Sequence, residues 1–454
     1  MNIPVKGVNR SPAVSYQELL DRDTRDPPDI LRLDQPVDFG SEPIAASRYT
    51  SEAFFKREIE KVFLKTWQYV CREEEMPSPG DTQVFEVVGH SAIVVRQKDG
   101  GLKAFRNVCL HRGRRLVTES GCKSQFRCPY HGFTWNTDGS FKENPMAWDF
   151  PEIDEERFGL PEIPVGSWGG FVFVNFDVGA QPLAEVADPL PRHFARWKIA
   201  DCYKSAHVAK VVPANWKAVI EAFLESHHVY TTHPQFSGFI ADANAQYDVL
   251  SEHVTRFLTA NGLPSPLIDA ADWPEEKVAE LMLGPPGAGA SAHLAAGQTA
   301  RAYVAQKARE RLAAETGDDH AYAADAEVID GISYQMFPAF AIWGGFHTKI
   351  CYRWRPHNLR VDQTLMEVLL FKECPADGPR PDPAPYRLLG EHEPWASATE
   401  LEYLASVFDQ DQSNLGPVQQ GLYDLGEEGV VHFGRYSEVR CRHIHVMVDK
   451  YLAR

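Results

Sequence analysis

Two short stretches decide the fold of the first half of the chain: residues 109–116, CLHRGRRL, and residues 128–140, CPYHGFTWNTDGS. The first stretch contains Cys109 and His111, and the second contains Cys128 and His131. Pairs this close put two side chains on one tight loop, so two such loops can hold one metal centre. Thiolates and imidazoles together suit zinc or an iron–sulfur cluster. We therefore interpret these residues as metal ligands and not as ordinary core residues.

The residue types within each cysteine–histidine pair distinguish a zinc site from an iron–sulfur cluster. Zinc fingers commonly pair residues of one type, two cysteines and then two histidines. Here each pair mixes one cysteine with one histidine. This arrangement places both sulfurs on one iron and both imidazoles on the other, which is the ligand set of a Rieske cluster. A zinc-stabilised β module that only binds partners is the alternative.

Both stretches resemble the Rieske loops of ring-hydroxylating oxygenase large (alpha) subunits. The resemblance implies a Rieske 2Fe–2S cluster with Cys109 and Cys128 on one iron and His111 and His131 on the other. Cys122 lies between the loops and matches no ligand position. Around the loops, short strand-like runs are separated by the hairpin-turn signals KDGG at 98–101 and NTDGS at 136–140, so this region is predicted to be a small β domain.

A chain of 454 residues is too long for one typical core, so we expect two domains after an arm. The predicted fold class is α+β: an all-β Rieske iron–sulfur domain, then a helix-grip catalytic domain of antiparallel sheet and helices. The boundaries are a loosely ordered N-terminal arm at 1–47, a Rieske domain with a flanking helix at 48–180, and a mononuclear iron domain at 181–454. Residues 400–425 are predicted to form two helical pieces broken at Asn414–Pro417, and CRHIHV at 441–446 is predicted to form a strand.

A second candidate metal site lies in residues 215–236, NWKAVIEAFLESHHVYTTHPQF. The first part has helical periodicity, with an apolar stripe that His227 extends and a polar stripe that includes Glu225 and His228. This pattern predicts that His227 faces the core. The helix is expected to end before Pro234, so that His228 and His233 can reach one metal across the helix end.

The same stretch resembles the iron helix of the ring-hydroxylating family. The resemblance implies that His228 and His233 bind a mononuclear Fe(II) and that Glu225 is the buried acid that carries electrons to it. The family's third ligand is an aspartate eight residues before a glutamine. Asp411 has that spacing from Gln419, with Asp409 as its rival. Two histidines and one carboxylate leave coordination positions open for O2.

The resemblance also implies an activity and partners. We expect a terminal oxygenase, fed from NAD(P)H by a separate ferredoxin and/or flavin reductase. In the family, chains form a homotrimer, with or without a small beta subunit, and the cluster of one subunit serves the iron of its neighbour. The expected reaction is cis-dihydroxylation of an apolar substrate with an aromatic ring. The predicted pocket residues are aromatic: Phe223, Phe337, Phe340, Trp343 and Phe408. A monooxygenase or demethylase acting on a quaternary amine is the alternative, because Glu225 stands where many dioxygenases have aspartate.

Composition excludes some classes of function. The formal net charge is -17, from 46 basic and 63 acidic side chains, which disfavours general binding to nucleic acid or to an anionic membrane. The sequence has no apolar run of transmembrane length and no signal-like start, so we expect a cytoplasmic protein. In that compartment its eight cysteines are expected to be thiols or metal ligands.

Overall fold

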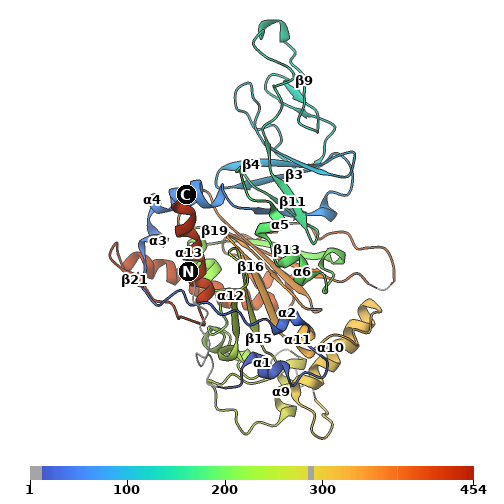
Figure 1. Cartoon of the computed structure of the whole chain (residues 1–454), viewed down its shortest axis with the longest axis vertical. Helices are drawn as coiled ribbons and strands as arrows, with labels where there is room; N and C mark the ends of the chain where they lie inside the picture. Colours follow the sequence, from blue (N-terminus) through green and yellow to red (C-terminus); the bar gives the residue numbers. More distant parts are fainter. Residues whose placement is uncertain (1–12, 285–290, 376) are drawn as a thin grey trace. The chain divides into compact units, whose positions relative to one another are not determined.

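The computed structural model describes residues 13–284, 291–375 and 377–454 (Figure 1). Residues 1–12 of the predicted arm lie outside this range. The chain forms two compact units. One contains residues 56–186, and the other combines residues 13–55 with residues 187–453. Helix α4 (Glu52–Glu58) spans the boundary in the chain.

The smaller unit is built mainly from strands. A five-stranded sheet has the order β10-β5-β4-β3-β6, and two three-stranded sheets have the orders β11-β12-β2 and β7-β8-β9. The strands are β2 (Gln68–Arg72), β3 (Asp81–Val87), β4 (His90–Arg96), β5 (Leu102–Arg106), β6 (Gly121–Cys122), β7 (Phe126–Arg127), β8 (Thr134–Trp135), β9 (Phe141–Glu143), β10 (Glu162–Ile163), β11 (Val165–Trp168) and β12 (Phe171–Val174).

Both predicted hairpins of this unit are confirmed. The turn at 98–101 joins the antiparallel pair β4 and β5, and the turn at 136–140 joins β8 and β9. Gly139 has a φ of +89°, and a Cβ there would lie 2.3 Å from a ring carbon of Phe105. Only glycine satisfies both the left-handed backbone and this close approach.

The larger unit is organised around an eight-stranded sheet with the order β14-β15-β16-β17-β18-β19-β13-β20. All neighbours are antiparallel except β13 and β20. The strands are β13 (Tyr203–Val212), β14 (Gln246–Val249), β15 (Val254–Thr259), β16 (Gly331–Met336), β17 (Phe340–Trp343), β18 (Lys349–Pro356), β19 (Thr364–Lys372) and β20 (Arg387–Leu388). The helices are α1 (Tyr16–Leu20), α2 (Asp29–Arg32), α3 (Ser47–Thr50), α6 (Leu190–Phe194), α7 (Trp216–Glu221), α8 (Val229–Thr232), α9 (Glu275–Leu283), α10 (Ala300–Thr316), α11 (Asp325–Ile329), α12 (Leu404–Asp424) and α13 (Val439–Leu452).

One face of this sheet is covered by the helices that carry the candidate site. Phe223, just after α7, and Phe408 of α12 both pack against Tyr352 of β18. Arg440 of α13 donates a hydrogen bond to Thr255 of β15. Because alternate residues of a strand point to opposite faces, these contacts place α7, α12 and α13 over the same face. The expected combination of an antiparallel sheet gripped by helices is confirmed.

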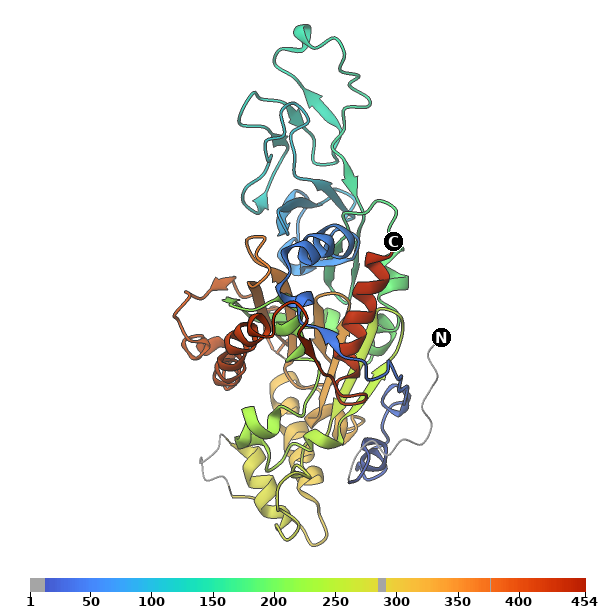
Figure 2. The same ribbon diagram turned by 90° about the vertical axis from the view of Figure 1, so that its left-hand side faces the viewer.

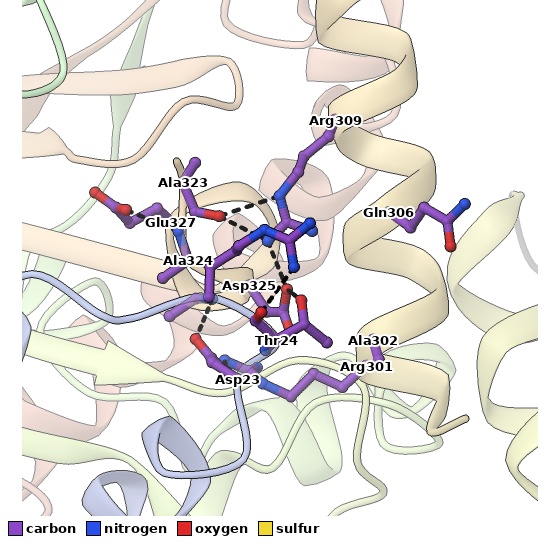
Figure 3. Close-up of polar contacts among 12 residues, drawn as sticks. Asp23, Thr24, Arg301, Ala302, Gln306, Arg309, Ala323, Ala324, Asp325 and Glu327 are labelled. Atoms are coloured by element: carbon purple, nitrogen blue, oxygen red, sulfur yellow. Dashed lines mark hydrogen bonds and ion pairs between the residues drawn. The ribbon is translucent and has the colours of Figure 1, made fainter. Parts of the chain in front are cut away.

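Residues 13–45 are ordered against the larger unit, so the expectation of a loosely ordered arm is wrong for them. Figure 2 shows this segment in dark blue at the outside of the unit. Gln35 donates its backbone N–H to the Asp248 carboxylate. Figure 3 shows a second attachment, where Thr24 donates to Asp325 through both its backbone N–H and its hydroxyl. Arg309 of α10 pairs with the same carboxylate at 2.6 Å.

Three local predictions are wrong. Residues 441–446 belong to helix α13. Apolar residues recur at helical spacing over the whole of α13, whereas these six residues alone also fit the alternation of a strand. Residues 404–424 form one helix, α12, with Pro417 inside it. The chain after Asn215 does not form one long helix: α7 ends at Glu221, and turns separate it from α8.

Candidate metal centres

The two cysteine–histidine loops adopt the same local structure. In each, the backbone N–H of the cysteine (Cys109 or Cys128) donates to a carbonyl five residues later. In each, a glycine then donates back to the cysteine carbonyl, Gly113 in one loop and Gly132 in the other. Both glycines have positive φ, 76° and 82°, a conformation that glycine adopts without strain. The loops are thus paired, tightly closed turns.

These loops bring the four predicted cluster residues together. Cys109 and Cys128 are buried, and their thiols lie within hydrogen-bonding contact of each other. The rings of His111 and His131 have centroids 4.6 Å apart. Nδ1 of His111 is buried and has no hydrogen-bond partner among the described residues. A buried ring nitrogen without a partner is costly unless it binds something such as a metal, so the residues fit a cluster.

Two opposing effects act on the thiol of Cys109. Burial raises the pKa of the Cys109 thiol, and the backbone N–H groups of His111 and Arg112, which point at its sulfur, oppose that rise. Asn107 fixes the loop from beneath, because its Oδ1 accepts from the backbone of Leu116 and Val117. No motif in the sequence marks Asn107, whose only signal is its position two residues before Cys109.

A recess of about 330 Å³ lies beside His111, within the smaller unit. His111 and Phe133 stack at 4.6 Å, and Phe150 contacts both rings edge-on. Acidic side chains stand at the rim, with Glu152 and Asp154 among the lining residues. The recess is therefore next to the cluster loops, and all of its lining residues belong to the smaller unit.

The second candidate centre forms around the single turn of α8. His228 precedes this helix and His233 follows it, so both imidazoles project from its ends. Their ring centroids are 5.3 Å apart. Asp411 reaches them from α12: its Oδ1 is 2.8 Å from Nε2 of His233 and 3.8 Å from Nε2 of His228. One ligand atom from each of the three residues lies within 4.8 Å of the others. Such a set fits a metal with open positions.

Asp409 and Asp411, the two candidates for the third iron ligand, have different surroundings in the structure. Asp409 accepts from the backbone N–H groups of Trp395 and Ala396, at 2.8 and 2.9 Å. Its carboxylate therefore caps a short helical turn. Asp411 is 6% exposed and faces both histidines. Gln419, which supplied the spacing argument, instead accepts from the backbone of Asn215.

Gln410 orients His233, although no motif in the sequence marks it. Its Oε1 lies 2.8 Å from Nδ1 of His233 and also accepts from Gln235. An amide oxygen only accepts, so Nδ1 of His233 must carry the proton and Nε2 presents its lone pair toward Asp411. Fixing the tautomer through the second ring nitrogen is typical of metal-binding histidines. The position next to Asp411 is the only sequence signal.

Glu225 joins two histidines. Its Oε1 is 2.6 Å from Nδ1 of His228, and its Oε2 is 2.9 Å from Nδ1 of His227. Burial raises the pKa of Glu225, but the hydrogen bonds from His227 and His228 outweigh burial and bring that pKa to about 2. The hydrogen bond to Glu225 raises the pKa of His227. The prediction that His227 faces the core is wrong: its side chain is 45% exposed, because α7 ends before it.

Two of the five predicted pocket residues join an aromatic cluster beside Asp411. Phe223 and Phe408 contact each other, Phe223 also contacts Tyr352 and Trp354, and ring centroids are 5.1–6.4 Å apart. Burial, and after it the charge of Asp411, raises the pKa of Tyr352 well above its ordinary range. The Tyr352 hydroxyl therefore lies within electrostatic range of the Asp411 carboxylate.

The other three predicted pocket residues, Phe337, Phe340 and Trp343, make ring contacts outside this aromatic cluster or point away from it. Phe340 pairs with Arg353 and its neighbour Ala341 pairs with Tyr352, so Phe340 points to the opposite face of the sheet from Tyr352. Phe337 stacks on Tyr451 of α13. Both are therefore left out of the proposed pocket. Trp343 lies on the same face as Tyr352 and packs near Phe257.

Comparison with known families agrees with this arrangement. Residues 66–154 match the Rieske [2Fe-2S] domain, and residues 192–454 match the ring hydroxylating alpha subunit (catalytic domain). The chain therefore belongs to the ring-hydroxylating oxygenase alpha-subunit family, with a Rieske domain ahead of its catalytic domain. Its cofactors are a Rieske 2Fe–2S cluster and a mononuclear non-haem iron.

Several characterised proteins are similar in sequence. The oxygenase subunit of carnitine monooxygenase from Acinetobacter pittii is 34% identical over 213 residues, 44% of this chain and 57% of that protein. The large oxygenase component of naphthalene 1,2-dioxygenase from Pseudomonas putida is 32% identical over 195 residues, 40% of this chain and 42% of that protein. The chain thus spans about half the length of the relatives it matches.

Solved structures share the fold over a longer stretch. A quaternary ammonium Rieske monooxygenase has a TM-score of 0.64 at 19% identity, covering 91% of this chain and 96% of the other. A naphthalene 1,2-dioxygenase with indole in its active site has a TM-score of 0.61 at 19% identity, covering 91% and 92%. Within the described ranges, no helix is both long and apolar enough to cross a membrane.

Proposed function

We propose that this chain is the terminal oxygenase component of a Rieske non-haem iron oxygenase. The observation that carries the proposal is the convergence of His228, His233 and Asp411, whose ligand atoms lie within 4.8 Å of one another. When bound, a mononuclear iron in such a site activates O2 for insertion into a substrate, using electrons that the Rieske cluster delivers one at a time.

The roles of the protein side chains follow from their contacts. His228 and His233 present Nε2 to the iron, because Glu225 and Gln410 accept the protons on their Nδ1 atoms. Asp411 supplies the carboxylate ligand. Cys109, His111, Cys128 and His131 hold the cluster. Glu225 connects His228 to the protein surface and is the residue through which electrons reach the iron.

The leading substrate proposal is an apolar molecule with an aromatic ring, hydroxylated on that ring by cis-dihydroxylation. An aromatic cluster near Asp411 supports it: Phe223 packs on Tyr352, Trp354 and Phe408, and the Tyr352 hydroxyl lies within electrostatic range of Asp411. Flat apolar rings pack well against such a cluster. The naphthalene 1,2-dioxygenase relative is in accord with this proposal.

A second candidate is monooxygenation of a quaternary ammonium compound. The same aromatic cluster can hold a quaternary ammonium cation through cation–π attraction. Glu225 in place of the more usual aspartate and the similarity to carnitine monooxygenase both favour this candidate.

Electrons are proposed to come from a separate ferredoxin and/or flavin reductase and to pass between neighbouring copies in a homotrimer. Charge supports the contact between copies. Arg112, Arg114 and Arg115 are exposed on the cluster loop. The region of His227 is acidic, because Glu225, Glu438 and Asp242 all act to raise the pKa of His227. A basic loop from one copy can thus dock on the acidic region of the next. We also propose a cytoplasmic location, because Cys109 and Cys128 are proposed as thiolate ligands of a metal centre, a use of cysteine that is typical of a reducing compartment.

Turnover with purified reductase and a mixed substrate panel tests the reaction. The panel contains naphthalene, salicylate, carnitine and choline, and products are identified by mass spectrometry. A cis-diol supports ring dihydroxylation, whereas a single hydroxyl or a released aldehyde supports the monooxygenase. Protein that is colourless and contains zinc without iron would contradict both.

Electron transfer between copies is tested by mixing two inactive variants in one assembly. Cys109→Ser lacks the cluster, and Asp411→Ala lacks the mononuclear iron. Co-expressed chains regain part of the turnover if the cluster of one copy serves the iron of another. No recovery in verified mixed assemblies would restrict electron transfer to one chain. The mass of the assembly reports the number of copies and any small companion subunit.

A further inference from the structure

Arg440, on helix α13, is a fully buried arginine without a carboxylate partner. Its side chain is 0% exposed. Within the described ranges, no carboxylate oxygen lies within ion-pair distance of its guanidinium. Asp248 acts on its charge from a greater distance, but that carboxylate is already paired with Arg256 at 2.6 Å. A buried charge without a partner is costly, so the protein gains stability if an anion binds there.

The guanidinium of Arg440 has one nitrogen left to bind a ligand. Nε donates to the hydroxyl of Thr255 at 3.1 Å, and Nη1 donates to the carbonyl of Leu224 at 3.2 Å. Nη2 is buried and has no hydrogen-bond partner among the described residues. Burial lowers the pKa of Arg440 to about 9, so the group keeps its charge at neutral pH. The two bonds hold the planar group in place while its third nitrogen stays open.

Arg440 is connected to the candidate iron site through the backbone. Leu224, whose carbonyl it binds, directly follows Phe223 in the chain. The ring of Phe223 contacts the ring of Phe408, which shares α12 with Asp411. Arg440 therefore lies beside the segment that contributes to the aromatic cluster near Asp411.

A second connection runs along the sheet. The guanidinium carbon of Arg440 lies 4.9 Å from the centroid of the Phe257 ring, on β15. Phe257 contacts Trp343 of β17, with ring centroids 6.5 Å apart. Trp343 lies on the same sheet face as Tyr352, a member of the aromatic cluster. Arg440 and the cluster thus lie over one face of the sheet, with aromatic side chains on the strands between them.

The chemistry of this arrangement favours a carboxylate. A guanidinium matches a carboxylate in shape and charge, and the two groups form strong charge-assisted hydrogen bonds. A water molecule would satisfy Nη2 but would leave the charge of Arg440 without a counter-ion. An aromatic ring or a quaternary ammonium group can pack against the aromatic cluster, and a carboxylate attached to that group can extend toward Arg440.

We propose that Arg440 binds a carboxylate group of the substrate, and that the substrate is a carboxylic acid whose other end is an aromatic ring or a quaternary ammonium group. This inference rests on the proposed function and names its substrate class. Arg440 determines specificity, because a substrate without the carboxylate leaves the buried charge unpaired.

Two matched pairs of compounds test the inference with the full-length wild-type protein. Naphthalene is compared with 2-naphthoate, and choline with glycine betaine, so that one member of each pair carries a carboxylate. Turnover with the reductase gives kcat/KM for each compound, and thermal denaturation of the iron-loaded protein reports binding without turnover. In the pair that is oxidised, the acid is expected to have a kcat/KM about tenfold or more above that of its partner. The acid should also raise the thermal midpoint more than its partner does.

Variants of two buried arginines on α13 make the result specific. Arg440→Gln keeps hydrogen-bond donors and removes the charge. It is expected to lower the ratio of kcat/KM between acid and partner about tenfold or more, through a higher KM for the acid. Arg440→Lys restores a charge and should recover part of the ratio. Arg442→Gln is the control, because Arg442 donates to the backbone carbonyls of Phe433 and Gly434. It should lower stability and leave the ratio unchanged.

The outcomes separate this inference from the proposed function. If red-brown protein oxidises naphthalene or choline as efficiently as the matching acid, the inference is wrong and the oxygenase function stands. An unchanged ratio in Arg440→Gln would also overturn it, and if that variant does not fold, the wild-type comparison of each acid with its partner decides. Colourless protein that contains zinc would defeat the proposed function. In that case a rise in thermal midpoint that only the acids produce would still support carboxylate binding at Arg440, and equal shifts would overturn it.

Discussion

Asp409 and Asp411 lie two residues apart on α12, yet their carboxylates serve different parts of the protein. Asp411 approaches Nε2 of His233 at 2.8 Å, while Asp409 caps the turn at Trp395. A spacing of two residues turns a helix by about 200°. Neighbouring acids on one helix therefore point in nearly opposite directions, and only one of them can meet the two histidines.

Substitution of these aspartates should separate iron binding from stability. Asp411→Asn is expected to lose most of the mononuclear iron, because the charged ligand is gone, with the cluster retained. Asp409→Asn should keep iron and lower the free energy of unfolding by about 1 kcal/mol through the weakened cap. Metal analysis and thermal denaturation measure both effects. Iron loss in the Asp409 variant alone would reverse the assignment.

Cys128 and Cys122 are a matched pair of positions for testing which cysteines bind the cluster. Cys128 is buried within the loop, whereas Cys122 is exposed. Cys128→Ser is expected to abolish the red-brown colour and to remove cluster iron and sulfide, because a serine oxygen replaces the thiolate ligand. Cys122→Ser should leave the visible spectrum unchanged. A coloured Cys128 variant would show that this residue is not a ligand.

The substitution Glu225→Gln tests the hydrogen-bonded link that Glu225 makes between His227 and His228, and it keeps the shape of the side chain. The amide can accept from only one of the two histidines and carries no charge, so the contact between Glu225 and His228 is weakened. We expect both metals to remain and coupled turnover to fall about 10- to 100-fold. Product formation is measured together with metal content. Wild-type turnover in this variant would remove Glu225 from the proposed route.

Gln410→Ala should weaken iron binding indirectly. Without the acceptor at Nδ1, the His233 ring can rotate or change tautomer, and the affinity for iron is expected to fall about 10- to 100-fold. Gln412→Ala is the control, because Gln412 accepts from the indole N–H of Trp395 instead. Iron retention during titration with a chelator measures the difference. Equal retention in both variants would show that Gln410 has no role in orienting His233.

The buried Asp23 predicts a specific dependence of stability on pH. Burial, with a smaller contribution from Asp330, raises the pKa of Asp23 to about 6 even though Arg301 opposes the rise. The folded protein therefore binds a proton more readily than the unfolded chain, and this group adds stability as the pH falls from about 6 to about 4. The raised pKa costs about 3 kcal/mol at neutral pH.

Asp23→Asn removes this titration while keeping the size of the side chain (Figure 3). The stability of the wild type relative to this variant should rise as the pH is lowered from 7 to 5. Thermal midpoints measured for both proteins across that range test the sign. A difference that stays constant with pH would contradict the raised pKa.

The closeness of the four proposed cluster ligands was predictable because it depends on local sequence. Cys109 and His111 share one tight turn, as do Cys128 and His131, so the spacing of each pair already places it on a loop. The hairpin turns around them follow from glycine positions in the same way. Asp411 was predictable only through a resemblance in spacing, since Asp409 lies on the same helix and has the same chemistry.

The roles of His227, Gln410 and Asp409 were decided by tertiary structure alone. Helical periodicity predicted that His227 faces the core, but the chain turns after Glu221 and exposes it. Gln410 meets His233 across 177 positions of sequence. Which pairs of distant side chains meet depends on how α12 packs against α8 and the sheet. The sequence by itself determined the loops that carry the two proposed sets of metal ligands, because these loops depend on neighbours in the chain. Which acid approaches the two histidines and which imidazole faces solvent depends on long-range packing that no local pattern encodes.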